Sequence, residues 1–375
     1  MAKQWGGILY AMGSMLQTAG FMAFSGGLFA YFKRRGIGKG AWQGLLAALL
    51  IGCLSLMTPD MAPSLLSNSV NWTTTDTLDS LAISHAMPAL RFSTSAVASM
   101  VKLALQGVLA IIPAVLLCRM AREDRERISL PDARPVIFDI AVAKVFWALA
   151  AMVLCMSYLG MNTFSEDPQS ILASVGAAAV QGKDSFLPAC GVSLVIALLG
   201  GLAAGGIGYC FIRTFGRGGR GFGLCMLLLT AAGGFYGAAF IRYFELGLRN
   251  TILPVVIRQM VDARMVGLMI LLALLMRLAP QRSHKGMFVG LALLGAVIAW
   301  GDYLSPRWYG MQQLPVAYVF HQMITGMVRA SAVFPEDVDA MKASLPVLGA
   351  LTTLPALLLG TGGALALMRA FKKAE

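Results

Sequence analysis

The chain has 375 residues, of which 58% are apolar and 13% are charged, and its formal net charge is +12. A soluble domain carries about 25% charged residues, and one or two soluble domains could not bury this much apolar surface, so a water-soluble fold is excluded. The basic residues lie in short clusters between apolar stretches instead of on one soluble face. We therefore expect no nucleic-acid partner.

Nine apolar stretches follow one another along the chain, and each is long enough to cross a bilayer as a helix. A span needs about 18 apolar residues or more, and it must be helical because lipid offers the backbone no hydrogen-bond partners. Barrel strands are shorter, at about 10 residues, and alternate in polarity. The predicted fold is an all-α, polytopic transmembrane bundle of about nine spans (eight to ten), which forms a single integral membrane domain over residues 1–375. The predicted spans are 8–32, 41–58, 96–118, 136–160, 189–212, 222–244, 263–281, 286–304 and 346–369.

The distribution of Lys and Arg predicts the orientation of the chain. When loops are assigned alternately to the two sides of the membrane, more than half of the 30 Lys and Arg residues fall on one side, in short loops. Cytoplasmic loops carry such an excess. We therefore expect the N-terminus outside and the C-terminus in the cytoplasm, in a multi-pass protein of a bacterial inner membrane.

The loops on the predicted outer side are long and contain apolar patches that are too short or too polar to span. Such patches are typical of helices that lie in the membrane interface or re-enter the bilayer. An alternative for the last patch is a tenth span interrupted by His321 and Arg329. The three patches are 78–92, 250–261 and 314–332.

Glycines at helical spacing mark several predicted spans. They allow close helix packing of the small-xxx-small type, and they also occur in unwound stretches that line a cavity. We favour packing for 189–212 and 222–244 and keep both interpretations for the last span. The glycines concerned are Gly201, Gly205, Gly233, Gly237 and Gly362.

Two segments share a layout in which a glycine-rich helix leads into a basic, glycine-containing loop. They are residues 26–40 and 200–221. Internal repeats of this kind are found in many transporters. A pseudo-repeat with halves 1–160 and 189–375 is therefore an alternative to an unrepeated bundle.

Ionisable residues at membrane depth are the candidates for a functional site, because a charge in hydrocarbon is costly unless it is paired or hydrated. Lys144 lies about 12 Å into its span at 1.5 Å per residue, and Asp139 points away from it on the same helix. One interpretation is structural, with salt bridges at helix ends and snorkelling lysines. The other is a cationic lining for an anionic substrate, a quinone or a proton path. The candidates are Lys144, Asp139, Lys102, Gln106, Arg242 and Glu245.

The chain offers few ligands for a cofactor. Its three histidines are too few for the axial ligands of a two-haem membrane cytochrome, and its six cysteines are scattered without a C-x-x-C pair. We therefore expect no intrinsic haem and no metal site. No catalytic motif is visible, so an enzymatic role would be that of a quinone-interacting membrane subunit of an oxidoreductase.

Three glycine-rich stretches resemble helices of the polysulfide-reductase/NrfD type of haemless, quinone-binding membrane subunit. They are FSGGLFAYF (24–32), ALLGGLAAGG (197–206) and AAGGFYGAAFIRYF (231–244), about a tenth of the chain in total. The resemblance implies a quinone cofactor and extracytoplasmic partner subunits docked on the long outer loops. The family's Asp-Leu-Gly turn after its second helix is replaced here by LMTPDMAP (56–63), which puts the quinone site in doubt.

The function that the sequence favours is transport of a small solute by a permease, carrier or channel-type protein. The solute would be anionic if the cations at membrane depth line its path. One alternative is a haemless membrane subunit of a quinone-linked respiratory complex. Another is the membrane channel component of a secretion or conjugation machine. Asp139 and Asp302, the latter two residues from the end of its span, are the acidic residues inside the predicted spans. They lie in different spans and form no central cluster of carboxylates, which weighs against a carrier coupled through such a cluster.

Overall fold

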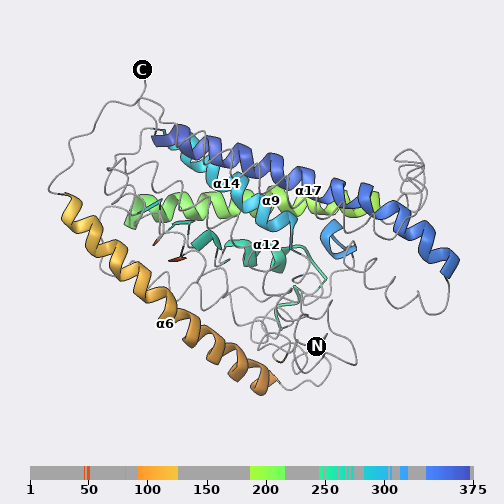
Figure 1. Ribbon diagram of the computed structural model, residues 1–375, viewed down its shortest axis with the longest axis horizontal. Coiled ribbons are helices and arrows are strands. Elements are labelled where there is room, and N and C mark those ends of the chain that lie inside the picture. Colours follow the sequence, from red (N-terminus) through yellow and green to blue (C-terminus); the bar gives the residue numbers. More distant parts are fainter. Residues whose placement is uncertain are drawn as a thin grey trace, which may run out of the picture.

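The structure, a computed structural model, describes five helices and several short connecting segments (Figure 1). All regular structure within these residues is helical, and they contain no strand. The all-α prediction is therefore confirmed for the described part of the chain. The described residues are 46, 49, 50, 81, 92–125, 186–215, 245–248, 250–260, 262, 264–266, 268, 269, 272, 273, 283–302, 305, 313–319 and 335–371.

Three of the described helices are long and apolar enough to cross a membrane. Their crossing segments are Ser93–Pro113, Phe186–Arg213 and Thr352–Ala370. A fourth apolar helix has 17 residues, about 25 Å of helix. These lengths and compositions are compatible with a membrane protein. The five helices are α6 (Phe92–Arg125), α9 (Phe186–Phe215), α12 (Leu253–Met260), α14 (His284–Trp300) and α17 (Pro335–Phe371).

The helices α9 and α14 pack in direct contact because glycines and alanines line their interface. A Cβ added to Gly200 would lie 3.2 Å from the Cβ of Ala299, and one on Gly205 would lie 2.8 Å from the Cβ of Ala292. A Cβ on Gly201 would lie only 2.5 Å from the carbonyl oxygen of Ala292. Larger side chains do not fit here, so the two backbones approach closely, as in small-xxx-small pairs.

A second face of α14 packs against α17. A Cβ on Gly290 would lie 2.5 Å from the side chain of Leu367. Near the other end of α14, the indole N–H of Trp300 donates to the carbonyl oxygen of Thr352 at 2.7 Å. Therefore α9 and α17 run in one direction and α14 in the opposite one, as alternate crossing of a membrane requires.

The glycines of the last span lie within a continuous helix and do not form the unwound stretch that was one of the two interpretations. The Thr361 hydroxyl donates to the carbonyl oxygen of Leu357, four residues earlier, at 2.8 Å. A Cβ on Gly362 would lie 3.3 Å from the side chain of Leu293 in α14. These small residues bring α17 close to α14.

An apolar core closes the end of the bundle where α9 begins and α14 ends, which we call the Trp300 end. The described part of the predicted patch 314–332 packs into this core, and the amide N–H of Val316 donates to the hydroxyl oxygen of Ser193 in α9 at 2.7 Å. The beginning of that patch is therefore buried against the helices. The core consists of Phe186, Ala189, Ala197, Ala296, Trp300, Val316 and Val319.

The predicted span 263–281 is helical at each of its described positions. Met265, Leu268 and Leu272 are fully buried. Met269 is buried with them, and its Cε lies 2.9 Å from the Cβ position of Gly208 in α9. The described residues of this segment are thus helical and buried inside the bundle.

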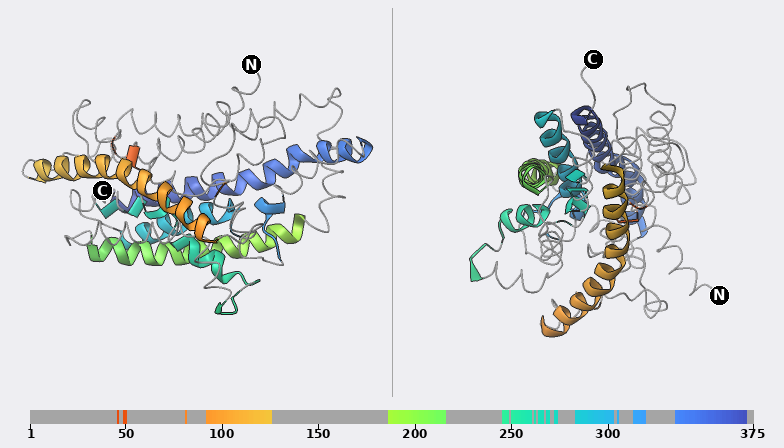
Figure 2. Two further views of the ribbon diagram at one scale, coloured as in Figure 1. Left: turned by 90° about the horizontal axis from the view of Figure 1, so that it is seen from below. Right: turned by 90° about the vertical axis from the view of Figure 1, so that its left-hand side faces the viewer.

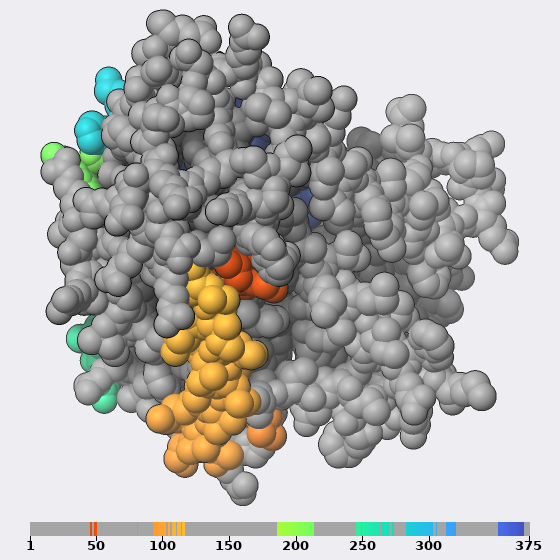
Figure 3. Space-filling view, turned by 60° about the vertical axis from the view of Figure 1, so that its left-hand side comes forward, coloured from red at the N-terminus to blue at the C-terminus, as the bar shows by residue number. Residues whose placement is uncertain are grey.

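The helix α6 lies apart from α9 and α12 (Figure 1, Figure 2) and exposes a band of apolar side chains on the surface (Figure 3). Val97, Leu105 and Val108 are each about 60% exposed. Leu194 and Leu198 of α9 are exposed to a similar degree. Continuous apolar surface on helices of spanning length suits contact with hydrocarbon.

The predicted end of the span 286–304 is wrong. The helix α14 ends at Trp300 and not at residue 304. The N–H of Gly301 closes the last turn by donating to the carbonyl oxygen of Val297. The carboxylate of Asp302 accepts a hydrogen bond from the backbone N–H of Ser305, and this side-chain bond competes with continuation of the helix. The helix α17 begins at Pro335, before the predicted span 346–369, and its candidate crossing segment is Thr352–Ala370.

Several predictions fall on residues that the structure does not describe. These are the spans 8–32, 136–160 and 222–244, most of 41–58, and the patch 78–92 apart from Leu81 and Phe92. The number of spans, the orientation and the pseudo-repeat therefore stay predictions.

Candidate functional site

The short helix α12 lies against α9 and α14 (Figure 1) and follows a turn with two left-handed residues. Gly247 has φ +67° and Asn250 has φ +66°. Glycine and asparagine are the residues that adopt this conformation at least cost. The hydroxyl of Thr251 donates to the carbonyl oxygen of Leu248 at 2.7 Å and fixes the turn. Glycine and asparagine thus allow the turn that directly precedes α12.

One face of α12 carries both apolar and polar side chains into the protein. Val255 and Val256 are buried, and so are Arg258 and Gln259, which follow them at helical spacing. Residues three and four positions apart lie on the same side of a helix. The buried face of α12 thus brings a guanidinium and an amide to the Trp300 end of the bundle.

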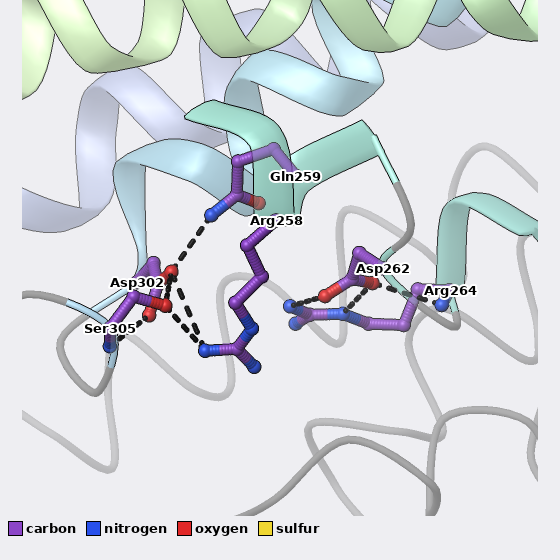
Figure 4. A network of polar contacts seen from close by, with 6 residues as sticks. All are labelled: Arg258, Gln259, Asp262, Arg264, Asp302 and Ser305. Atoms are coloured by element: carbon purple, nitrogen blue, oxygen red, sulfur yellow. Dashed lines mark hydrogen bonds and ion pairs between the residues drawn. The ribbon is translucent and has the colours of Figure 1, made fainter. Parts of the chain in front are cut away.

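These two side chains meet the segment that follows α14 (Figure 4). The carboxylate of Asp302 accepts hydrogen bonds from Gln259 Nε2 at 2.8 Å and from the backbone N–H of Ser305 at 3.1 Å. The hydroxyl of Ser305 donates to the same carboxylate and accepts a hydrogen bond from Arg258 Nη1. Arg258 Nη1 lies 3.9 Å from Asp302 Oδ2. We call these four residues the Asp302 cluster.

The charges of the Asp302 cluster are largely removed from solvent. The side chains of Arg258 and Asp302 are 9% and 10% exposed. Removing one member of such a pair costs about 3–5 kcal/mol, because the other charge stays buried and uncompensated. The pair is therefore a strong determinant of how α12 sits against α14.

Gln259 lies in the contact between α12 and α9. Gln259 is 2% exposed. Its Cβ lies 3.5 Å from the position that a Cβ on Gly200 of α9 would take, so a larger residue at position 200 would press against Gln259. Its Oε1 atom is enclosed and has no hydrogen-bond partner among the described residues. A buried unpaired carbonyl costs about 1–3 kcal/mol. The docked arrangement of α12 therefore leaves one polar group unsatisfied.

A second ion pair begins the next helix, beside the Asp302 cluster (Figure 4). Arg264 Nε and Nη2 each lie 3.0 Å from the carboxylate of Asp262, a bidentate pair. The backbone N–H of Arg264 also donates to Asp262 Oδ1 at 2.9 Å. Burial by itself raises the pKa of Asp262, but the guanidinium groups of Arg264 and Arg258 outweigh it and hold the pKa below its usual range.

The chemistry of this region is electrostatic and structural. Two guanidinium groups and two carboxylates balance one another in charge and lie on three successive segments of the chain. Within the described ranges, no group of three or more His, Cys, Asp or Glu is placed to hold a metal ion. What the arrangement can do is fix the position of α12.

The predicted site residues are not brought together in the described part of the chain. Lys102 is half-buried in α6, and Gln106 lies four residues further along the same helix. Glu245 is exposed and helical, directly before the turn that precedes α12. Gly201, Gly205 and Gly362 lie at helix contacts, as given above. Outside the described residues are Lys144, Asp139, Arg242, Gly233 and Gly237.

Sequence reasoning missed the Asp302 cluster. Asp302 was not among the candidate residues, and 250–261 was predicted as a helix that lies in the membrane interface or re-enters the bilayer. The signal was present, because Arg258 and Gln259 share a helical face with Val255 and Val256. An interfacial helix keeps its charges on the face opposite the apolar one. Polar residues on the apolar face indicate a buried polar contact instead.

Comparison of the chain with protein-family models, with curated proteins and with solved structures found no match.

Proposed function

We propose that this chain is a multi-pass protein of a bacterial inner membrane, with about nine spans, that transports a small solute. The observation that carries the proposal is the buried, charge-balanced Asp302 cluster at the end of closely packed apolar helices. Ionisable groups among membrane helices are expensive and commonly mark a solute or ion path.

The proposed orientation has the N-terminus outside and the C-terminus in the cytoplasm, which places the Trp300 end and the Asp302 cluster on the outer side. Its support is the excess of Lys and Arg in alternate loops. The opposite directions of α14 and of its neighbours α9 and α17 are compatible with it. Single-cysteine labelling of loop residues in intact cells would test it.

The first experiment is gentle purification of the tagged protein from its native membrane, with mass spectrometry of whatever accompanies it, followed by reconstitution into liposomes. We expect a lone, monodisperse species that raises the flux of a small anionic, cationic or neutral solute above that of empty liposomes. Stoichiometric co-purification of redox proteins or secretion-system components would overturn the proposal. The chain would then be the membrane subunit of a larger complex.

A further inference from the structure

We propose that one end of the bundle binds the headgroup of an anionic phospholipid. At this end, which we call the Arg369 end, α9 and α17 end and α14 begins (Figure 1). The headgroup contacts three cations, one from each helix, and the acyl chains lie against apolar side chains of α14 and α17. The inference rests on the proposed membrane location and is independent of transport. The cations are Arg213, Lys285 and Arg369.

Hydrogen bonds join the three helices at the Arg369 end. The backbone N–H of Ser283 donates to the carbonyl oxygen of Ala370 in α17 at 3.2 Å. The hydroxyl of Tyr209 in α9 lies 2.7 Å from Nδ1 of His284, and the two rings meet edge to face. Each of the three cations lies within four residues of one of these bonds. The cations are therefore held near one level of the bundle.

The three cations are placed to receive an anionic ligand. All three are exposed, and within the described ranges no ion pair joins them to an acidic residue. The last turns of α9 and α17 and the first turn of α14 contain no Asp or Glu. Arg and Lys donate strong, charge-assisted hydrogen bonds to phosphate oxygens. The Arg369 end thus complements a phosphate group.

Apolar side chains follow the cations toward the middle of the helices, which favours a phospholipid over a soluble phosphate. Val289 lies one turn after Lys285 in α14 and is 43% exposed. Leu365 lies one turn before Arg369 in α17 and is 47% exposed. Residues four positions apart share a face of a helix. Each helix therefore presents a cation at its end and an apolar side chain beside it, in the order of a headgroup and its acyl chains.

The faces of α14 and α17 that carry these side chains adjoin each other. A Cβ on Gly362 would lie 3.3 Å from the side chain of Leu293. Gly362 lies seven residues, or about two turns, before Arg369, and Leu293 lies four residues after Val289. Both contact residues thus share the faces in question. The proposed orientation places this joint surface at the cytoplasmic leaflet, which carries anionic lipids.

Native mass spectrometry of the full-length protein in mild detergent tests the site. The probes are phosphatidylglycerol and phosphatidylcholine with identical acyl chains, and we expect phosphatidylglycerol to bind more tightly. Lys285→Gln should weaken the binding of phosphatidylglycerol by about fivefold, the factor that one cation contributes beside an anionic headgroup. Arg369→Gln, on the neighbouring helix, should have an effect of the same size. Neither substitution should change the binding of phosphatidylcholine.

Lys342→Gln is the matched control, because it removes the same charge near the other end of α17. It should leave the affinity for phosphatidylglycerol unchanged. Equal weakening by Lys342→Gln and Lys285→Gln would overturn the site, since the overall charge would then decide the binding. Equal affinity for the two lipids would also overturn it. Displacement of the lipid by inorganic phosphate at equal concentration would show an anion site without a lipid and would exclude the proposal.

Lipid binding and transport are separable in these measurements. Solute flux through liposomes, without a preference for phosphatidylglycerol in the binding experiment, would refute the lipid site and leave transport standing. A preference that depends on Lys285 and Arg369, without any flux, would refute transport and leave the lipid site standing.

Discussion

Gly201→Ala is the sharpest test of the α9–α14 interface, because the added Cβ would lie 2.5 Å from the carbonyl oxygen of Ala292. Ordinary van der Waals contacts of a Cβ begin at 3.4 Å, so the two helices must separate by about 1 Å to make room. A gap of this size removes a quarter to a half of the dispersion energy of each contact between them. Such overpacking costs about 1–3 kcal/mol. Alanine returns at most about 1 kcal/mol in helix propensity, and the net change is destabilising, up to about 2 kcal/mol.

Gly206→Ala is the matched control on the same helix, since a Cβ there meets no atom within 4 Å. It should change stability only through propensity, by up to about 1 kcal/mol in the stabilising direction. The assay is thermal denaturation in detergent, followed by fluorescence-detected size exclusion of both variants. A Gly201→Ala protein that melts at or above the temperature of Gly206→Ala would refute the close packing of α9 and α14.

Three further predictions concern single polar contacts. Ser193→Ala removes the acceptor of the buried Val316 N–H and should lower the free energy of unfolding by about 1–3 kcal/mol. The control Ser99→Ala loses only a bond within α6 and should lower it by less. Equal melting temperatures of the two variants would contradict this prediction. Trp300→Phe loses the bond to Thr352 and should destabilise by about 1 kcal/mol in the same assay; an unchanged melting temperature would argue against that bond. The pKa of Asp262 is lower in the folded protein than in the unfolded chain, so the ionised carboxylate stabilises the folded state. This contribution is fully present above the unfolded pKa of about 3.9 and is lost as the pH falls through the folded pKa. Asp262→Asn should flatten that acid loss in a pH series, and an unaltered profile would exclude Asp262 as its source.

Local sequence patterns allowed part of the fold to be predicted. The helices α6, α9 and α17 lie where uninterrupted apolar stretches predict spans, because a helix satisfies its own backbone wherever it is placed. Gly201 and Gly205, at a spacing of four, share one helical face by geometry alone. Their contact with α14 agrees with the packing interpretation.

The ends of the helices were harder to predict than their middles. Hydropathy continues past Trp300 through Tyr303 and Leu304, so it cannot reveal that Gly301 and Asp302 stop α14. That stop depends on which hydrogen bonds the carboxylate of Asp302 makes, and two of its partners come from α12 and from Ser305. A contact between distant segments decided a local boundary.

The sequence by itself therefore indicated apolar helices long enough to cross a membrane, and the faces on which small residues gather. These follow from composition and from the period of the helix. Only the tertiary structure decided that Arg258 and Gln259 lie against Asp302, 43 or more residues away along the chain. Each of these polar residues could equally have been hydrated at a membrane surface. Burial joined them, because a charge or amide removed from water must find its partner within the protein.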